Sequence, residues 1–239
     1  MATKRKVGEV VIDLTLDAGA APSSPKRARL AGPVKNAPLA EFEEKKKKGP
    51  KRRPAPDKWI QYFSKSTDDV GKRLSNFFPC QIVYAGKTYA SVEHAYQAQK
   101  YAHLLGSDPE TSAALVNRFT VSGDIGKQPA KVAKSAGSEK GMAENDCVLD
   151  ETKWTRTKQV EIMTQLVKLR LEEDAEFKAI ITKAKETGTT IFHFERCSGN
   201  RNPFWGGCFP KADKKKIWIG RNKMGRILMK SILPVPVPV

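Results

Sequence analysis

The chain has 239 residues, which is enough for one well-packed domain with appendages or for two small domains. Its formal net charge of +17 at pH 7 points to a polyanionic partner such as nucleic acid. No apolar run approaches the roughly 20 residues that a membrane helix needs, and the N-terminus lacks the apolar stretch of a secretory signal. The four cysteines show no CxxC spacing, which favours a reducing compartment. We therefore expect a soluble intracellular protein that makes no membrane contact.

Residues 1–57 differ in composition from the rest of the chain. They mix Ala, Pro, Lys and Ser with few aromatic residues, so they cannot bury enough apolar surface to offset the chain entropy lost on folding. We expect a disordered basic tail with two clusters, SPKRARL at 24–30 and KKKKGPKRRP at 45–54. Such clusters are typical of segments that bind nuclear-import receptors or phosphate backbones. A solubilising tail is the alternative interpretation.

A short run in this tail, VVIDLTL at 10–16, is β-prone and contains acidic residues. Such a run can add a strand to the sheet edge of a partner, as SUMO-interacting motifs do. SUMO and a nuclear-import receptor are therefore expected partners of the tail. We expect a nuclear protein, with a cytoplasmic pool left open.

Globular composition begins with the first predicted strand, WIQYFS at 59–64. The segment QIVYAGKTYA at 81–90 predicts two strands that turn around Ala85–Gly86–Lys87. Ser91 is then the predicted N-cap of a helix that ends near Gly106.

The longest periodic segment, 153–171, places Ile162, Leu166 and Leu169 on the core face of a helix. The other elements predicted in this half of the chain are helices at 109–117, 129–136 and 222–232, a helix from Asp174 to before Gly188, and a strand at 189–195. Short strands among clustered helices predict an α+β fold.

We expect a single compact, mostly helical domain with a small β-sheet over residues 58–233. A proline-rich C-terminal tail follows at 234–239, where the prolines forbid a longer helix.

One predicted helix carries an unusual polar strip within SVEHAYQAQK at 91–100. Because a helix turns by about 100° per residue, Glu93 and Lys100 differ by only about 20° in azimuth, and Gln97 lies between them. Such a strip is either a solvated face or the floor of a reactive site.

Five sequence blocks decide between these alternatives, and in this order they resemble the NADAR superfamily of YbiA-like N-glycosidases. The blocks are LSNFFP (74–79), GKTYASVEHAYQAQK (86–100), KW (153–154), FWGG (204–207) and GRNKMGRILM (220–229). The resemblance covers residues 59–233 and implies a compact α+β fold that splits N-glycosidic bonds. It implies two substrate classes, ribosylamine intermediates of the riboflavin pathway and ADP-ribose attached to guanine in nucleic acid.

Within this resemblance, Glu93 matches the active-site glutamate of the family and Lys100 its lysine. Both substrate classes link ribose through an exocyclic amine, so the sugar can open to an imine. A neutral lysine can attack that imine, and a carboxyl group in reach can move the protons. In the alternative, Lys100 pairs with Glu93 or with a substrate phosphate, and water attacks directly.

The resemblance also implies a set of substrate contacts from several blocks. These are Arg73, Asn76, Phe77, Gln97, Trp154, Lys158, Asn202, Trp205, Gly206, Gly207 and Asn222. Core packing is the alternative for the aromatic residues, and a surface position is the alternative for Lys158. Asn202 stands where the family commonly has an acid in D-x-x-W-G, and an amide cannot act as a base. The inserted KADKKK at 211–216 would suit a nucleic-acid backbone or an ordinary exposed loop.

No metal and no cofactor are expected. His193, Cys197 and Cys208 are irregularly spaced and lack a fourth ligand.

Three functions remain open at this point. The first is a nuclear enzyme that removes ADP-ribose from guanine, with ADP-ribosylated nucleic acid as its partner and ADP-ribose as its product. The second is an N-glycosidase for ribosylamine phosphates, and the third an inactive reader of ADP-ribose or adaptor for nucleic acid. The basic charge favours the first, and the substitution at Asn202 favours the third.

Overall fold

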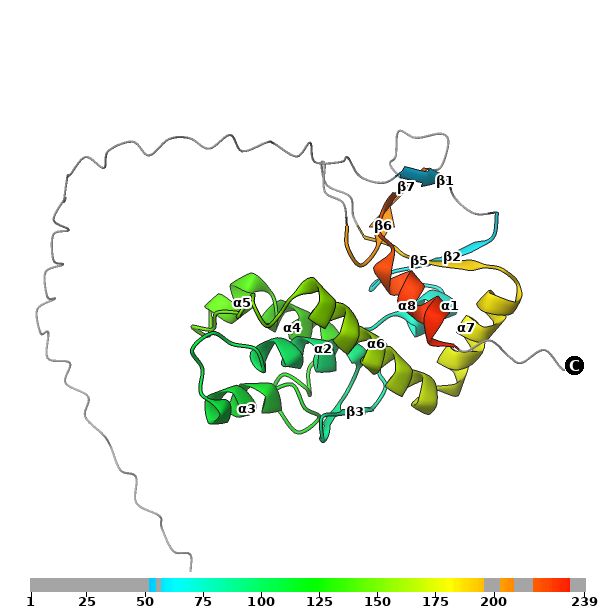
Figure 1. The fold of residues 1–239 in the computed structure, drawn as a ribbon. Coiled ribbons are helices and arrows are strands. Elements are labelled where there is room, and N and C mark those ends of the chain that lie inside the picture. The colour runs from blue at the N-terminus through cyan, green and yellow to red at the C-terminus, as the bar shows by residue number, and fades with distance from the viewer. Residues whose placement is uncertain (1–51, 55–56, 196–202, 209–216, 233–239) are drawn as a thin grey trace, which may run out of the picture. The chain divides into compact units, whose positions relative to one another are not determined.

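The computed structural model describes residues 52–54, 57–195, 203–208 and 217–232 (Figure 1). These residues belong to one compact unit, Lys47–Val239. The predictions for residues 1–51 of the tail, for Asn202, for the insert at 211–216 and for the tail at 234–239 concern residues outside the described ones. Within the tail predicted to be disordered over residues 1–57, Arg52–Pro54 instead form a strand, β1. Within the described part, no helix is both long and apolar enough to cross a membrane.

The fold is α+β and mostly helical, as the sequence predicts. In chain order the described elements are β1 (Arg52–Pro54), β2 (Trp59–Tyr62), α1 (Asp69–Leu74), β3 (Ile82–Tyr84), β4 (Lys87–Tyr89), α2 (Val92–Tyr101), α3 (Pro109–Asn117), α4 (Ala130–Ala136), α5 (Glu139–Ala143), α6 (Arg156–Glu173), α7 (Ala175–Glu186), β5 (Thr190–His193), β6 (Gly207–Cys208), β7 (Ile217–Gly220) and α8 (Lys223–Ser231).

The described strands form three small sheets and not one. β1, β7 and β6 form an antiparallel sheet in that order, and β3 pairs with β4 as a hairpin. The hairpin turns at Ala85 and Gly86, whose φ angles are 50° and 72°. Two successive positive φ values are those of a type I′ turn, which matches the twist of the flanking strands. The turn therefore lies where the sequence predicts it.

β2 and β5 form a parallel pair, in which Tyr62 lies opposite His193. A parallel pair needs a crossover connection, and here the connection contains every helix from α1 to α7. Figure 1 shows β2 in cyan beside β5 in yellow, with α8 next to β5. Contacts from α8 to β5 make this pair part of the core.

The core is built around α6, which packs against α2, α7 and α8. Ile162 and Leu166 are buried on its inner face, as predicted, whereas Leu169 is only partly buried. Asp174 caps α7 as predicted, because its carboxylate accepts a hydrogen bond of 2.9 Å from the Phe177 N–H. The same carboxylate binds the fully buried guanidinium of Arg170 at 3.2 Å.

Candidate active site

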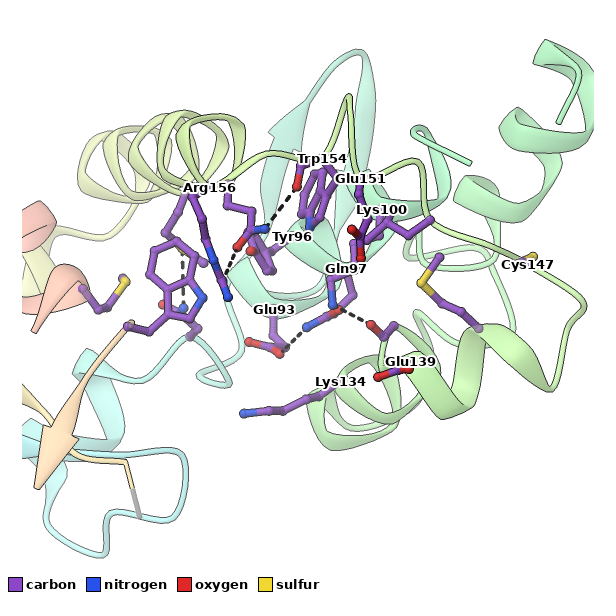
Figure 2. A pocket seen from close by; sticks show the side chains of 18 of the residues that line it. Glu93, Tyr96, Gln97, Lys100, Lys134, Glu139, Cys147, Glu151, Trp154 and Arg156 are labelled. Atoms are coloured by element: carbon purple, nitrogen blue, oxygen red, sulfur yellow. Dashed lines mark hydrogen bonds between the residues drawn. The ribbon is translucent and has the colours of Figure 1, made fainter. Parts of the chain in front are cut away.

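Helix α2 carries the predicted polar strip and is buried on almost every side. It packs against α3, α4 and α6. The exposed fractions of Glu93 and Gln97 are only 7% and 5%, so the strip is not a solvated face. Glu93, Gln97 and Lys100 instead line one cavity of about 650 Å³. Figure 2 shows their side chains along the helix.

The surroundings of Glu93 favour the protonated form of its carboxyl group. Burial raises its pKa, although Lys134, a hydrogen bond from Gln97 and the charge of Lys100 act in the opposite direction. The Gln97 Nε2 donates to Glu93 Oε1 at 2.8 Å, which fixes the orientation of the carboxyl. A carboxyl with a raised pKa can act as a general acid near neutral pH.

The amine of Lys100 is shifted in the complementary direction. Burial lowers its pKa to about 8, with Lys134 adding to the effect and Glu93 opposing it. A pKa near 8 leaves about one amine in ten uncharged at pH 7. An uncharged lysine is a nucleophile, so Glu93 and Lys100 together offer an acid and a nucleophile to one cavity.

Gly137, at the end of α4, brings two of these side chains close to its backbone. Its carbonyl accepts a hydrogen bond of 2.5 Å from Lys100 Nζ. A Cβ on Gly137 would lie only 2.1 Å from Gln97 Oε1, so only glycine permits this packing. That Gln97 oxygen is buried and has no hydrogen-bond partner among the described residues.

Aromatic side chains form one wall of the cavity. The ring of Tyr96 lies 5.6 Å from that of Trp154 and meets Trp205 edge-on at 5.8 Å. All three residues line the cavity. Such a wall provides π-faces on which a base can stack, and it also packs the core, since Trp154 is only 5% exposed.

Further polar groups reach the cavity from other elements. His193 and Glu195 come from the end of β5, and Arg156 from the first turn of α6. Burial, helped by the charge of Lys134, lowers the pKa of His193 to about 4, so its ring is neutral at pH 7. Burial also raises the pKa of Glu195. The cavity thus contains a second carboxyl besides Glu93.

Six of the residues predicted from the sequence meet at this cavity: Asn76, Glu93, Gln97, Lys100, Trp154 and Trp205. Asn76 also supports α2, because its carbonyl accepts a hydrogen bond of 3.1 Å from the Glu93 N–H.

Arg73, Phe77 and Lys158 are not among the residues that line the cavity. Arg73 forms an ion pair of 2.5 Å with Asp174. The Phe77 ring lies beneath Lys134 Nζ, 5.4 Å from the ring centroid. Lys158 pairs with Glu161 on the surface of α6. The family resemblance predicted that these three side chains contact the substrate. Each of them instead has a partner within the protein.

Three residues that were predicted to contact the substrate instead support the backbone of the site: Asn222, Gly206 and Gly207. The Asn222 side chain accepts from the His193 N–H at 3.0 Å and donates to the Ile191 carbonyl at 2.8 Å. A Cβ on Gly206 would lie 2.1 Å from the His193 carbonyl oxygen. A Cβ on Gly207 would lie 2.3 Å from the Ile219 carbonyl. These residues therefore hold the end of β5 against its neighbours.

The sequence does not mark Tyr96, Lys134, Arg156 or Glu195 as site residues, and it marks His193 only as a candidate metal ligand. Tyr96 lies three residues after Glu93 on the same helix, so helical spacing alone could have found it. The other residues come from distant elements, and no local pattern marks them.

No cluster of three or more potential metal ligands occurs in the part of the chain that the structure describes. Cys208 is disulfide-bonded, whereas Cys80 and Cys147 are free thiols. The spacing of the cysteines, which favoured a reducing compartment, did not predict this disulfide.

Comparison with known proteins identifies a family and a similar solved structure. The NADAR domain model matches residues 62–231. A search of curated proteins finds no significant match. The NMR structure of the E. coli protein YbiA is similar at 21% sequence identity and a TM-score of 0.47, over 74% of this chain and 84% of that chain. The family model spans most of the chain, including α2 and the cavity. The protein therefore belongs to the NADAR domain family, and its general role is the N-glycosidase type of role associated with that family.

Proposed function

We propose that the protein hydrolyses the bond between ADP-ribose and the exocyclic amine of guanine in nucleic acid. The observation that carries this proposal is the pairing of Glu93 and Lys100 in one cavity. Burial raises the pKa of Glu93 and lowers the pKa of Lys100 to about 8. Each group is thereby shifted toward the protonation state that glycosyl transfer to an amine requires.

In the first half of the reaction, Glu93 donates its proton to the ring oxygen of the ribose as the bond from that oxygen to C1 breaks. The lone pair of the exocyclic nitrogen forms a C=N bond to C1. The uncharged amine of Lys100 then adds to C1. The guanine nitrogen takes a proton from the Lys100 nitrogen and departs, and C1 remains bound to Lys100 as an iminium.

In the second half, water adds to C1 of the iminium and loses a proton. The bond from C1 to Lys100 Nζ then breaks, the sugar leaves as an aldehyde that closes to ribose, and the free amine is restored. Neither half requires a cofactor.

A nucleotide substrate is supported by the composition of the cavity and of the chain. Tyr96, Trp154 and Trp205 offer π-faces for a purine, and base stacking of this kind contributes about 1–3 kcal/mol per base. Arg156 lines the same cavity and can bind a phosphate through its guanidinium. The net charge of +17 favours an extended polyanion over a small metabolite with a single phosphate. Nuclear localisation and an import receptor remain part of this proposal.

The decisive experiment compares two substrates, an oligonucleotide ADP-ribosylated on guanine and a ribosylamine phosphate. We expect release of ADP-ribose from the oligonucleotide. Glu93→Gln should lower the rate by about 10²–10⁴-fold, which is the usual contribution of general acid–base catalysis, while its circular dichroism spectrum stays native. Release from the ribosylamine phosphate alone would reassign the substrate. Tight binding of ADP-ribose without release from either would indicate a reader.

The imine route has its own test, reduction with borohydride during turnover. We expect a sugar adduct on Lys100, located by peptide mass spectrometry and absent from Lys100→Arg. Lys168→Arg, at an exposed lysine of α6, is the matched control and should retain both the adduct and the activity. An active enzyme that yields no adduct would favour direct attack by water.

A further inference from the structure

The end of β5 presents two side chains to the cavity, and their backbone is held from several sides. The His193 N–H is bound by Asn222 at 3.0 Å, and the Glu195 N–H donates to the Gly207 carbonyl at 2.8 Å. A Cβ on Gly206 would lie 3.1 Å from Glu195 Cγ. The Tyr62 ring also packs against the His193 ring, with centroids 5.1 Å apart. His193 and Glu195 are therefore fixed relative to each other.

The pair of His193 and Glu195 is unusual because the two atoms that face each other, Nδ1 and Oε1, are both hydrogen-bond acceptors. The His193 ring hydrogen-bonds the backbone carbonyl of Trp205. Its Nδ1 is buried and has no hydrogen-bond partner among the described residues, so the ring proton resides on Nε2 and Nδ1 is an acceptor. Glu195 Oε1 lies 3.6 Å from Nδ1, which is too far for a direct hydrogen bond.

These two acceptors need a donor, and one water molecule can supply both hydrogen bonds. We propose that His193 Nδ1 and Glu195 Oε1 together bind the hydrolytic water, with Glu195 as its base and His193 as its positioning residue. This inference rests on the proposed function, because it assigns the residue that completes the second half of that reaction.

The charge environment suits a carboxylate that accepts a proton from water. Burial raises the pKa of Glu195, and Lys134 and the Gly206 N–H counteract this shift. A carboxylate of raised pKa is a stronger base, and the nearby cation helps to keep it ionised. His193, with a pKa lowered to about 4, stays neutral and accepts the second O–H of the water.

The water oxygen forms a bond to C1 of the Lys100 iminium, and one water proton passes to Glu195. Glu195 returns that proton to Lys100 Nζ and accepts the hydroxyl proton as the bond from C1 to Nζ breaks. The products are the sugar aldehyde, the free Lys100 amine and a protonated Glu195, which then exchanges its proton with solvent.

This role also accounts for Asn202, which stands where the family commonly has an acid. A carboxyl group that holds the water already lies just after β5, so the amide at position 202 does not deprive the cavity of a base.

The test uses the full-length Glu195→Gln variant and the ADP-ribosylated oligonucleotide. We expect one equivalent of guanine-containing oligonucleotide to be released rapidly, with later turnovers slowed by about 10²–10⁴-fold. The borohydride-trapped Lys100 adduct should accumulate. Hydroxylamine attacks an iminium without a base and releases the sugar as an oxime, so it should restore turnover. Glu186→Gln, at an exposed position of α7, is the matched control and should behave like the wild type.

Substitution of His193 separates positioning from folding. His193→Leu removes the acceptor and should also accumulate an adduct that hydroxylamine releases. His193→Asn offers an amide oxygen near the position of Nδ1 and should retain most of the wild-type turnover. Equal loss of activity in both variants, without an adduct, would show that His193 serves only to stabilise the fold and would remove it from the water site.

The outcomes also separate this inference from the proposed function. If the wild type releases ADP-ribose through a trapped adduct and Glu195→Gln turns over normally, the water site is refuted and the proposed function stands. If the wild type forms no adduct under active conditions, the imine route and the water site fall together. A Glu195→Gln enzyme that is slow but not rescued by hydroxylamine would also refute the assignment.

Discussion

At the scale of single residues, Lys134 has the widest influence on the cavity. Its charge lowers the pKa of Lys100 and acts against the raised pKa values of Glu93 and Glu195. It contributes these effects from α4, although its own side chain is exposed. A single cation thus shifts the protonation of the proposed nucleophile and of both carboxyl groups in the same direction, toward loss of a proton.

The pH dependence of kcat/KM should report this influence. In the wild type the reactive form has Glu93 protonated and Lys100 uncharged, so the profile should be bell-shaped, with its two limbs set by the raised pKa of Glu93 and the Lys100 pKa of about 8. Lys134→Met removes a cation that favours loss of a proton from both groups. Both limbs of the profile should therefore move to higher pH.

Lys131→Met, on an exposed position of the same helix, is the control and should leave the profile in place. A profile that is identical in Lys134→Met and the wild type would contradict the proposed electrostatic role of Lys134.

The sequence predicts side chains that share one helix much better than side chains that meet through the tertiary fold. Glu93, Gln97 and Lys100 meet because a helix places residues seven apart on one strip. The partner of Arg73 is Asp174, which no local pattern connects to it. Glu195 likewise reaches the cavity only through the pairing of β5 with β2. Spacing contains no information about such contacts.

At the scale of elements, caps and turns were informative because their chemistry is local. Ser91 caps α2, and Ala85–Gly86 forms the hairpin turn, both as the sequence predicts. Local sequence patterns do not predict α1, α5, β1, β6 or β7. These elements have two to six residues, and such short segments depend on tertiary contacts more than on intrinsic propensity.

Asp174 is the element-scale residue whose loss should cost the most stability. It caps α7 and binds the buried Arg170 and the partly buried Arg73. Removing one partner of a buried ion pair costs about 3–5 kcal/mol, since the other charge is left unpaired. Asp174→Ala should lower the free energy of unfolding in urea by about that amount, whereas Asp69→Ala, at an exposed position, should change it little.

The stability from Asp174 should also depend on pH. Burial acts to raise the pKa of Asp174, but the Phe177 N–H, Arg73 and Arg170 outweigh it, so the pKa is lowered in the folded state. A lowered folded pKa gives stability that is present above the unfolded pKa of about 3.9 and is lost as the pH falls through the folded value. The difference between wild type and Asp174→Ala should therefore shrink in acid.

At the scale of the whole molecule, positive charge is divided between the two parts of the chain. Residues 1–58 carry a net charge of +8 and residues 59–239 a net charge of +9. The folded part therefore does not rely on the tail for its attraction to a polyanion. The tail adds a dense run of lysines at 45–48.

Replacing the four lysines at 45–48 with glutamine should weaken binding to an oligonucleotide but leave chemistry unchanged. Each phosphate contact to a single strand contributes about −0.7 to the slope of log K against log salt, so the slope should become shallower by up to about 3. Fluorescence anisotropy over a series of salt concentrations measures this. Turnover of free ADP-ribosyl guanosine should match the wild type. An unchanged slope would show that these lysines do not contact the nucleic acid.

The pairing of β2 with β5 has a consequence for biosynthesis. A ribosome makes β2 early and cannot supply its neighbour until all of α1–α7 has emerged, so the nascent chain carries an unpaired strand edge for most of its synthesis. Pairing of two strands that lie so far apart in the sequence is slow compared with helix formation. Truncated products that stop before β5 would contain α2 with its polar strip but would lack Glu195. We expect chaperones and proteases to act on such products, which would not be partly active enzymes.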